Sequence, residues 1–261
     1  IAAILEAVRH LQEENIPHGP LEVVFTVCEE VGLLGSRYLD YSLVQADCGY
    51  VLDGGGEPGT IINRGPAQDK LKAVIRGRAA HAGINPEDGI SAIQVAAKAI
   101  AEMNLLRIDA ETTANIGYIS GGGATNIVTE VVELHGEARS LDEQKLAKQS
   151  AHMRACLEQA CKKYQAKLEL EFVREYDAFR MAEDEAVVQL AIKAVESLGL
   201  PLQIAASGGG CDANFFNTKG IKTINLGTGM SQVHTTTEYI NKEDLINLTR
   251  LVAAIIQQAA Y

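Results

Sequence analysis

The stretch that decides the fold is an apolar, β-branched run ending in two adjacent carboxylates: Val23-Val24-Phe25-Thr26-Val27-Cys28-Glu29-Glu30-Val31-Gly32. The run has the length and composition of a fully buried strand, so we predict a strand over residues 22–28. Neighbouring side chains on a strand point to opposite faces, so the two glutamates can converge only where the chain leaves the sheet. Ligands of α/β proteins bind at the carboxyl ends of strands. The pair is therefore a candidate metal ligand and proton carrier; the alternative is a solvated loop that begins with two glutamates.

A second acid ends another short apolar strand. Residues 48–52 run into Asp53, which three glycines follow, and glycines let the backbone turn or pass close to a bound group. His234 comes after a glycine-rich turn near the end of the chain. Carboxylates and an imidazole suit Zn²⁺, Mn²⁺ or Co²⁺, although their spacing here is not a local metal motif.

Composition limits the function classes. The chain has 261 residues, 47% apolar and 22% charged, as in a soluble globular protein of one or two domains. A net charge of −11 argues against nucleic acid or an anionic membrane as the main partner. Five cysteines without framework spacing predict free thiols in a reducing compartment, and hence a cytoplasmic protein. No apolar run is long enough to span a bilayer.

The order of the elements predicts an α/β fold interrupted by a second domain. After residue 65 the pattern becomes βαββαβ, typical of a ferredoxin-like (split-βαβ) α+β unit. We predict its strands at 69–77, 113–119, 127–139 and 167–174, and its helices at 89–103 and 142–163. The α/β pattern then resumes, with helices at 183–198, 212–218 and 242–259 and strands at 202–206 and 221–226. We therefore assign residues 1–65 and 179–261 to a domain with a mostly parallel sheet covered by helices on both faces, and 66–178 to the insertion.

The start of the chain is unlike a complete protein. It has no initiator Met, and Ile1, Ile4, Leu5, Val8 and Leu11 keep helical period without a capping residue before them. We expect a fragment that lacks its N-terminal part.

An ordered set of motifs runs along essentially the whole chain. The motifs are Cys28-Glu29-Glu30-Val31-Gly32, Asp53-Gly54-Gly55-Gly56-Glu57-Pro58-Gly59, His81 within 77–83, Asn126 within 122–126, Arg139-Ser140, Gly209-Gly210-Cys211-Asp212, and His234-Thr235 with Glu238. The ordered set is more specific than any of its members. It resembles the M20 family of metallopeptidases, nearest its tripeptide aminopeptidase (peptidase T) branch.

The resemblance implies a two-metal hydrolase. Glu29 would be the general base that deprotonates a metal-bound water. Glu30 and His234 would hold one of two divalent ions and Asp53 the other, with zinc expected and cobalt or manganese as alternatives.

The resemblance also implies substrate contacts and a dimer. His81, from the inserted lid and dimerisation domain, would reach the active site of a partner subunit and act in catalysis there. Asn126 and Arg139 would bind the substrate, and an arginine is a natural fork for a carboxylate. A homodimer through the inserted domain follows from the same resemblance.

One departure from the family pattern bears on activity. The family uses five metal ligands, including a histidine in a His-x-Asp motif and a bridging aspartate, and both would lie upstream of Ile1. No His-x-Asp occurs in the chain, and no Asp precedes Asp40. We expect that this chain alone cannot assemble the dinuclear site and is inactive, whereas its parent protein can.

Several candidates have structural alternatives. His234 and His81 could be ordinary exposed loop histidines, and Arg139 could be a polar-face residue of a strand on which Glu133 and Glu137 alternate with it. Asp212 is read as a helix cap. The glycines at 208–210 lack the pattern of a phosphate-binding loop.

The predicted function is metal-dependent hydrolysis of short peptides by an aminopeptidase or tripeptidase. The alternatives are another M20 amidohydrolase, such as a carboxypeptidase or an N-acyl amino-acid deacylase, and a non-catalytic dimerising module without a complete metal site.

Overall fold

The computed structural model describes residues 1–260 and divides the chain into two compact units. Unit 1 combines Ile1–Gly65 with the chain from Phe179 onward, and unit 2 is Pro66–Ala178. The division falls at the same residues at which the hydrophobic pattern changes in the sequence.

Unit 1 contains a five-stranded mixed sheet in the order β1-β10-β2-β8, with β9 also pairing with β2. Its strands are β1 (Cys48–Gly54), β2 (Thr60–Gly65), β8 (Phe179–Arg180), β9 (Gln203–Ala206) and β10 (Lys222–Gly227). β1 is parallel to β10 and β2 is parallel to β9, whereas β2 is antiparallel to both β10 and β8. The prediction of a mostly parallel sheet was therefore wrong, because β2, which the sequence reading missed, runs against its neighbours β10 and β8.

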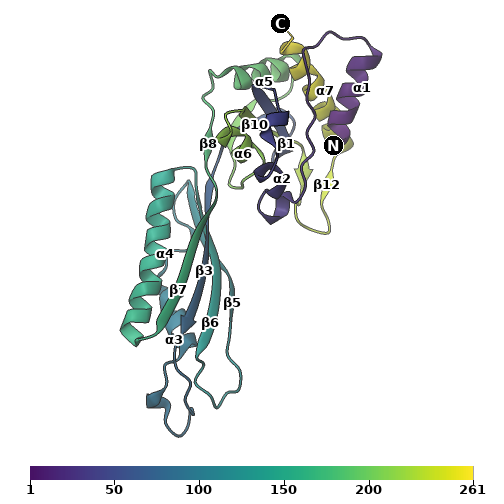
Figure 1. The fold of residues 1–261 in the computed structure, drawn as a ribbon. Coiled ribbons are helices and arrows are strands. Elements are labelled where there is room, and N and C mark those ends of the chain that lie inside the picture. Colours follow the sequence, from purple (N-terminus) through teal and green to yellow (C-terminus); the bar gives the residue numbers. More distant parts are fainter. Residues whose placement is uncertain (261) are drawn as a thin grey trace. The chain divides into compact units, whose positions relative to one another are not determined.

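The helices of unit 1, which Figure 1 labels, bury small and aliphatic side chains against this sheet and against one another. They are α1 (Ala2–Glu13), α2 (Leu34–Arg37), α5 (Ala186–Ser197), α6 (Ala213–Thr218) and α7 (Lys242–Gln258). A two-stranded ribbon, β11 (Met230–Ser231) with β12 (Tyr239–Ile240), lies before α7. The core includes Ile61 and Leu226 of the sheet and Val188 and Leu251 of the helices. In α1 the buried face is that of Ala3, Ala7 and Leu11, and Ile1 and Leu5 are exposed.

The predicted strand at 22–28 is not formed. Its backbone has no strand assignment, and its apolar side chains at Val23, Val24, Phe25 and Val27 are between 38% and 70% exposed. A strand needs a neighbour to complete its ladder of backbone hydrogen bonds. None of the described strands pairs with this segment, so the β-branched composition alone does not make it a strand.

Unit 2 is an antiparallel sheet in the order β4-β5-β6-β3-β7 with two helices. The elements are β3 (Ala67–Arg76), α3 (Ala92–Glu102), β4 (Leu106–Arg107), β5 (Thr112–Gly121), β6 (Val131–Ser140), α4 (Glu143–Tyr164) and β7 (Lys167–Tyr176). Apart from the short β4, their order is the β-α-β-β-α-β order expected from the sequence. Asp142 caps α4 by accepting hydrogen bonds from the backbone N–H groups of Gln144 and Lys145.

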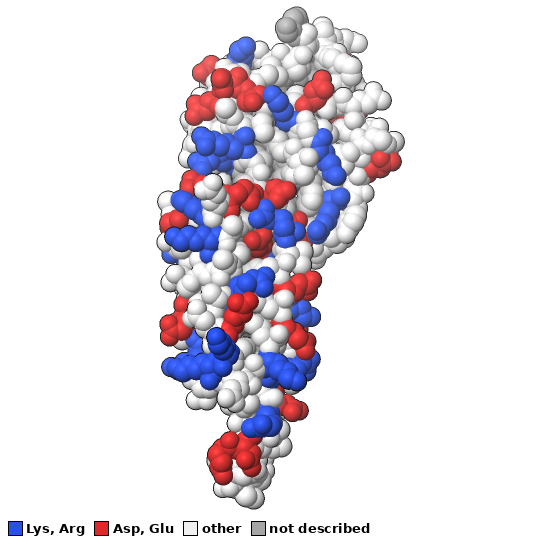
Figure 2. Space-filling view, turned by 60° about the vertical axis from the view of Figure 1, so that its left-hand side comes forward, with Lys and Arg blue, Asp and Glu red and all other residues white. Residues whose placement is uncertain are grey.

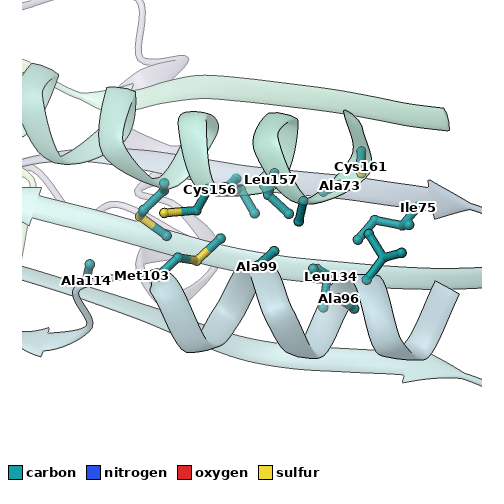
Figure 3. Close-up of a cluster of buried hydrophobic side chains, with 14 of the residues drawn as sticks. Ala73, Ile75, Ala96, Ala99, Met103, Ala114, Leu134, Cys156, Leu157 and Cys161 are labelled. Atoms are coloured by element: carbon teal, nitrogen blue, oxygen red, sulfur yellow. The ribbon is translucent and has the colours of Figure 1, made fainter. Parts of the chain in front are cut away.

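Both helices cover the same face of this sheet, and the core lies between them and the strands (Figure 3). Val132, Leu134 and Ala138 of β6 point into that core. The alternate residues of β6, Glu133, His135, Glu137 and Arg139, lie on the other face, as the alternation in the sequence predicts. One face of the sheet therefore remains open and polar.

The surface carries mixed charge. On the face seen in Figure 2, Lys and Arg side chains are interspersed with Asp and Glu. Among residues 1–260, no helix combines the length and hydropathy needed to cross a membrane.

Candidate active site

A tight turn places the two glutamates. Cys28 adopts a left-handed conformation with φ 56°, a short 3-10 helix follows over Glu29–Val31, and Gly32 is again left-handed. The turn is closed by Gly35, whose N–H donates to the carbonyl of Val27 at 2.9 Å. A Cβ on Gly35 would lie 2.5 Å from the backbone of Val27, so only glycine fits there. Although the predicted strand is absent, the chain does turn at the two glutamates.

Asp53 is the penultimate residue of β1. The backbone N–H of Asp53 donates to Oδ1 of Asn225 on the neighbouring strand β10 at 3.0 Å. This cross-strand hydrogen bond fixes the backbone at the point from which the exposed carboxylate leaves the sheet.

His234 lies in the loop between β11 and β12 and reaches the glutamate turn. Its backbone is left-handed, with φ 65°, and its N–H donates to the carboxylate of Glu238 at 3.0 Å. Nδ1 of His234 lies 3.7 Å from Oε2 of Glu30, and both side chains are 72% exposed. Fold topology thus brings together two residues that the sequence reading assigned to the same metal ion.

The site concentrates negative charge. Burial first, then repulsion from Asp53, Glu30 and Asp212, raises the pKa of the half-buried Glu29 to about 7, against a smaller opposing effect of His234. Desolvation, followed by repulsion from Asp212 and Glu30, also raises the pKa of Asp53, although Asp53 as a whole is exposed. These carboxylates therefore share one electrostatic environment.

Asp212 belongs to this cluster, and its reading as a helix cap was wrong. It precedes α6, but its side chain accepts no hydrogen bond from the helix backbone. Oδ2 instead accepts a 2.5 Å hydrogen bond from the hydroxyl of Thr26, and Oδ1 is buried with no partner among the described residues. The sequence held only a weak signal: three glycines at 208–210 and then Cys211 precede this acid, whereas three glycines directly follow Asp53.

The donor set suits a divalent cation but does not complete a site. Two ligands about 2.0–2.1 Å from one tetrahedral zinc lie about 3.3 Å apart, close to the Glu30–His234 spacing of 3.7 Å. Within residues 1–260, however, no three His, Cys, Asp or Glu side chains come close enough to hold a metal together. The described chain therefore supplies one pair of suitable donors, Glu30 and His234. Asp53 is close enough to interact with their charges but does not form a three-ligand group with them.

Two of the three residues of unit 2 predicted to meet substrate, His81 and Asn126, lie on two paired loops. His81 and Ile127 form an isolated β-bridge, and the N–H of Ala82 donates to the carbonyl of Asn126 at 2.9 Å. Nδ1 of His81 accepts from the N–H of Gly83 at 3.1 Å. The structure thus holds the His81 and Asn126 segments side by side.

Arg139 lies on the open polar face of β6. Its Nε and Nη2 donate to the two oxygens of Glu137 at 2.8 and 3.1 Å. Arg139 is therefore a polar-face residue of the strand, which is the structural alternative that the sequence allowed. One fork of its guanidinium, Nε with Nη2, is already hydrogen-bonded to Glu137. On the same face a hollow of about 410 Å³ is lined by Glu137, Lys70, Tyr118 and His135 among others.

Known proteins resemble the chain over its whole length. A model of peptidase family M20/M25/M40 matches residues 1–258. The uncharacterized protein YqjE of Bacillus subtilis is 45% identical over 260 residues, and peptidase T of Haemophilus influenzae is 27% identical over 263. The matches cover 100% and 98% of this chain but only 70% and 63% of those proteins.

Solved structures agree with the sequence matches. The aminopeptidase PepT from Bacillus cereus superposes with a TM-score of 0.91 at 44% identity, covering 100% of this chain and 70% of that one. A tripeptidase from Staphylococcus aureus superposes with a TM-score of 0.95 at 40% identity, covering 99% of this chain and 69% of that one. The match to the family model together with the similarity to YqjE shows that the chain belongs to peptidase family M20/M25/M40.

Proposed function

We propose that the protein from which this chain comes hydrolyses peptide bonds in short peptides, as a metal-dependent aminopeptidase of the tripeptidase type. Relatives that are 40–44% identical carry the names aminopeptidase PepT and tripeptidase, which supports this substrate class. The proposal rests on one observation above all: a carboxyl group with a pKa of about 7 lies in the same cluster as the Glu30–His234 pair.

Glu29 is the proposed general base. A carboxylate with a pKa near the working pH can take a proton from the attacking water and give it to the leaving amine. The same group is a poor base when its pKa is near 4.5, because the carboxylate then binds a proton only weakly at neutral pH. Its half-buried place among other carboxylates supplies the upward pKa shift that this role needs.

Glu30 and His234 are the proposed ligands of one divalent cation and Asp53 of a second, with zinc expected and cobalt or manganese as alternatives. Bound cations would polarise the scissile carbonyl and make water a nucleophile near neutral pH. Burial and, after it, mutual repulsion raise the pKa values of Glu29 and Asp53, and a nearby cation would relieve the repulsion.

We propose that unit 2 is a lid and dimerisation domain and that it supplies the substrate contacts. His81 and Asn126, held on paired loops, would contact the peptide around the scissile bond, with His81 serving a partner subunit in a homodimer. Arg139 would receive the carboxylate of the peptide's C-terminus.

We propose that the 261-residue chain is inactive by itself. The family pattern needs a His-x-Asp histidine and a bridging aspartate, and neither is among its residues. The absence of a complete coordination group within residues 1–260 favours the rival reading of a non-catalytic module. Activity measurements therefore need the complete gene product beside this chain.

Product analysis tests the proposal. The complete gene product, loaded with zinc, is given a tripeptide and an N-acyl amino acid in parallel, and products are identified by mass spectrometry. Release of the N-terminal amino acid and a dipeptide supports the aminopeptidase. Release of the C-terminal residue or of the acyl group would instead support a carboxypeptidase or a deacylase, and no hydrolysis of either would support the non-catalytic module.

A location in the cytoplasm is also proposed. All five cysteines are free thiols, as expected in a reducing compartment.

A further inference from the structure

We propose that Glu137 is a positioning residue that aims Arg139 at the C-terminal carboxylate of the substrate, an inference that rests on the proposed function. Glu137 and Arg139 are two residues apart on β6 and therefore share its open face. Glu137 Oε1 accepts from Arg139 Nε at 2.8 Å and Oε2 accepts from Nη2 at 3.1 Å. Two parallel bonds of this kind fix the plane of a guanidinium as well as its position.

The contact leaves one fork of the guanidinium without a hydrogen bond of its own to the described residues, on a side chain that is 28% exposed. Arginine presents two forks, one made by Nε with Nη2 and one made by Nη1 with Nη2. Glu137 occupies the first, and Nη1 of Arg139 has no hydrogen-bond partner among the described residues. A peptide carboxylate would therefore meet the end of a guanidinium that is already held in one orientation.

A neighbouring strand holds Glu137 in turn. Gln68 of β3 lies directly opposite Arg139 in the ladder, and its buried amide donates to Oε2 of Glu137. Lys70, which lies opposite Glu137, pairs with Glu175 at 3.4 Å. Among residues 1–260, Glu137 accepts from three donor atoms, two of Arg139 and one of Gln68, which is the arrangement that the positioning role needs.

Pre-organisation of this kind lowers the cost of ordering a side chain on binding. A guanidinium without its partner samples several rotamers, and each encounter with a carboxylate must then restrict them. The consequence is specific: loss of Glu137 should weaken binding of peptides with a free C-terminal carboxylate and leave peptides with an amidated C-terminus unaffected.

The test compares Glu137→Gln with wild type in the complete, zinc-loaded enzyme, using trialanine and trialanine amide. The glutamine keeps the shape and loses the charged fork, so KM for trialanine should rise about tenfold with kcat nearly unchanged. KM for the amide should not move. Glu133→Gln is the matched control, because Glu133 lies on the same face of β6 and pairs with Lys72 and His135 instead.

Gln68→Met is a second test variant, which removes the hydrogen bond from Gln68 to Glu137 and leaves the Glu137 side chain intact. It should raise KM for trialanine in the same direction but by less, with the amide again unaffected. Melting temperatures of all variants show whether each is folded.

An equal loss on both substrates, no change, or a lower KM for trialanine in Glu137→Gln would overturn the inference; the last result would mean that Glu137 competes with the substrate. If the wild-type enzyme cleaves no tripeptide, the proposed function fails on its own. Calorimetric binding of trialanine to wild type and Glu137→Gln then decides the positioning role, with equal affinities overturning it.

Discussion

The hydroxyl of Thr26 donates a 2.5 Å hydrogen bond to Oδ2 of Asp212, which lies 186 residues further along the chain. This bond ties the segment that leads into Glu29 to the turn that begins α6. The segment at 22–28 has no strand partner among the described residues. Side-chain contacts such as this hydrogen bond, rather than a ladder of backbone hydrogen bonds, therefore hold the segment that leads to the glutamates.

Replacing Thr26 with Val should therefore destabilise unit 1. The isosteric valine keeps the volume but leaves both oxygens of Asp212 without a hydrogen bond, which costs about 1.5–3 kcal/mol for a charged acceptor. Thr26→Ser keeps the hydroxyl and should lose less than half of that. Urea unfolding measures both, and equal stabilities of the two variants would contradict the role of this bond.

Glu29→Gln should stabilise the chain when metal is removed with a chelator. Glu29 has a pKa of about 7 in the folded protein and about 4.5 when unfolded, so the folded state binds more protons between these values. Wild-type stability then falls as pH rises from about 4.5 to 7, whereas the glutamine is unaffected. With allowance for the partial exposure of Glu29, the gain above pH 7 should be about 1–2 kcal/mol.

Unfolding free energies at pH 5 and pH 8 check this directly. The difference between Glu29→Gln and wild type should be small at pH 5 and larger at pH 8. A difference that is constant across this range would mean that the charge of Glu29 does not oppose folding.

The cysteines should differ sharply in reactivity. Burial raises the pKa of the Cys211 thiol to about 12, so almost no thiolate exists at pH 8, whereas Cys28 is exposed. Iodoacetamide followed by peptide mass spectrometry should find Cys28 alkylated first and Cys211 only after unfolding. Early alkylation of Cys211 in a Cys28→Ser variant would show that the loop around it opens.

Gly35→Ala tests the close approach that shapes the glutamate turn. Its added methyl group would lie 2.5 Å from the backbone of Val27, so the turn must shift, at a cost of about 1–3 kcal/mol. Gly19→Ala is the control, since no atom lies within 4 Å of its added Cβ. Melting temperatures should fall for the first variant and stay close to wild type for the second.

The periodicity of apolar residues along the sequence correctly predicted those parts of the fold that depend on short-range interactions. The alternation of Val132 and Leu134 with Glu133 and His135 assigned both faces of β6, and the βαββαβ order of unit 2 followed from such periodicities. The segment at 22–28 was misread because burial and strand pairing depend on neighbours that composition does not reveal.

The site was predictable only where a residue type carried its own signal. Adjacent glutamates and a histidine after a glycine turn indicated Glu30 and His234, which the structure places 3.7 Å apart. Asp212 was missed because a carboxylate before a helix is so often a cap, and only the distant partner Thr26 shows otherwise. The pKa of Glu29 could not be predicted either, since it depends first on burial and then on four charged groups, Glu30, Asp53, Asp212 and His234, that the fold gathers around it.

Turnover and metal content of Glu29→Gln in the complete gene product test the central claim most directly. With zinc supplied, the variant should bind as much metal as wild type while tripeptide hydrolysis falls by about 10²–10⁴-fold, because only the proton carrier is lost. Hydrolysis at the wild-type rate, with the same metal content, would contradict the role of Glu29 as the base.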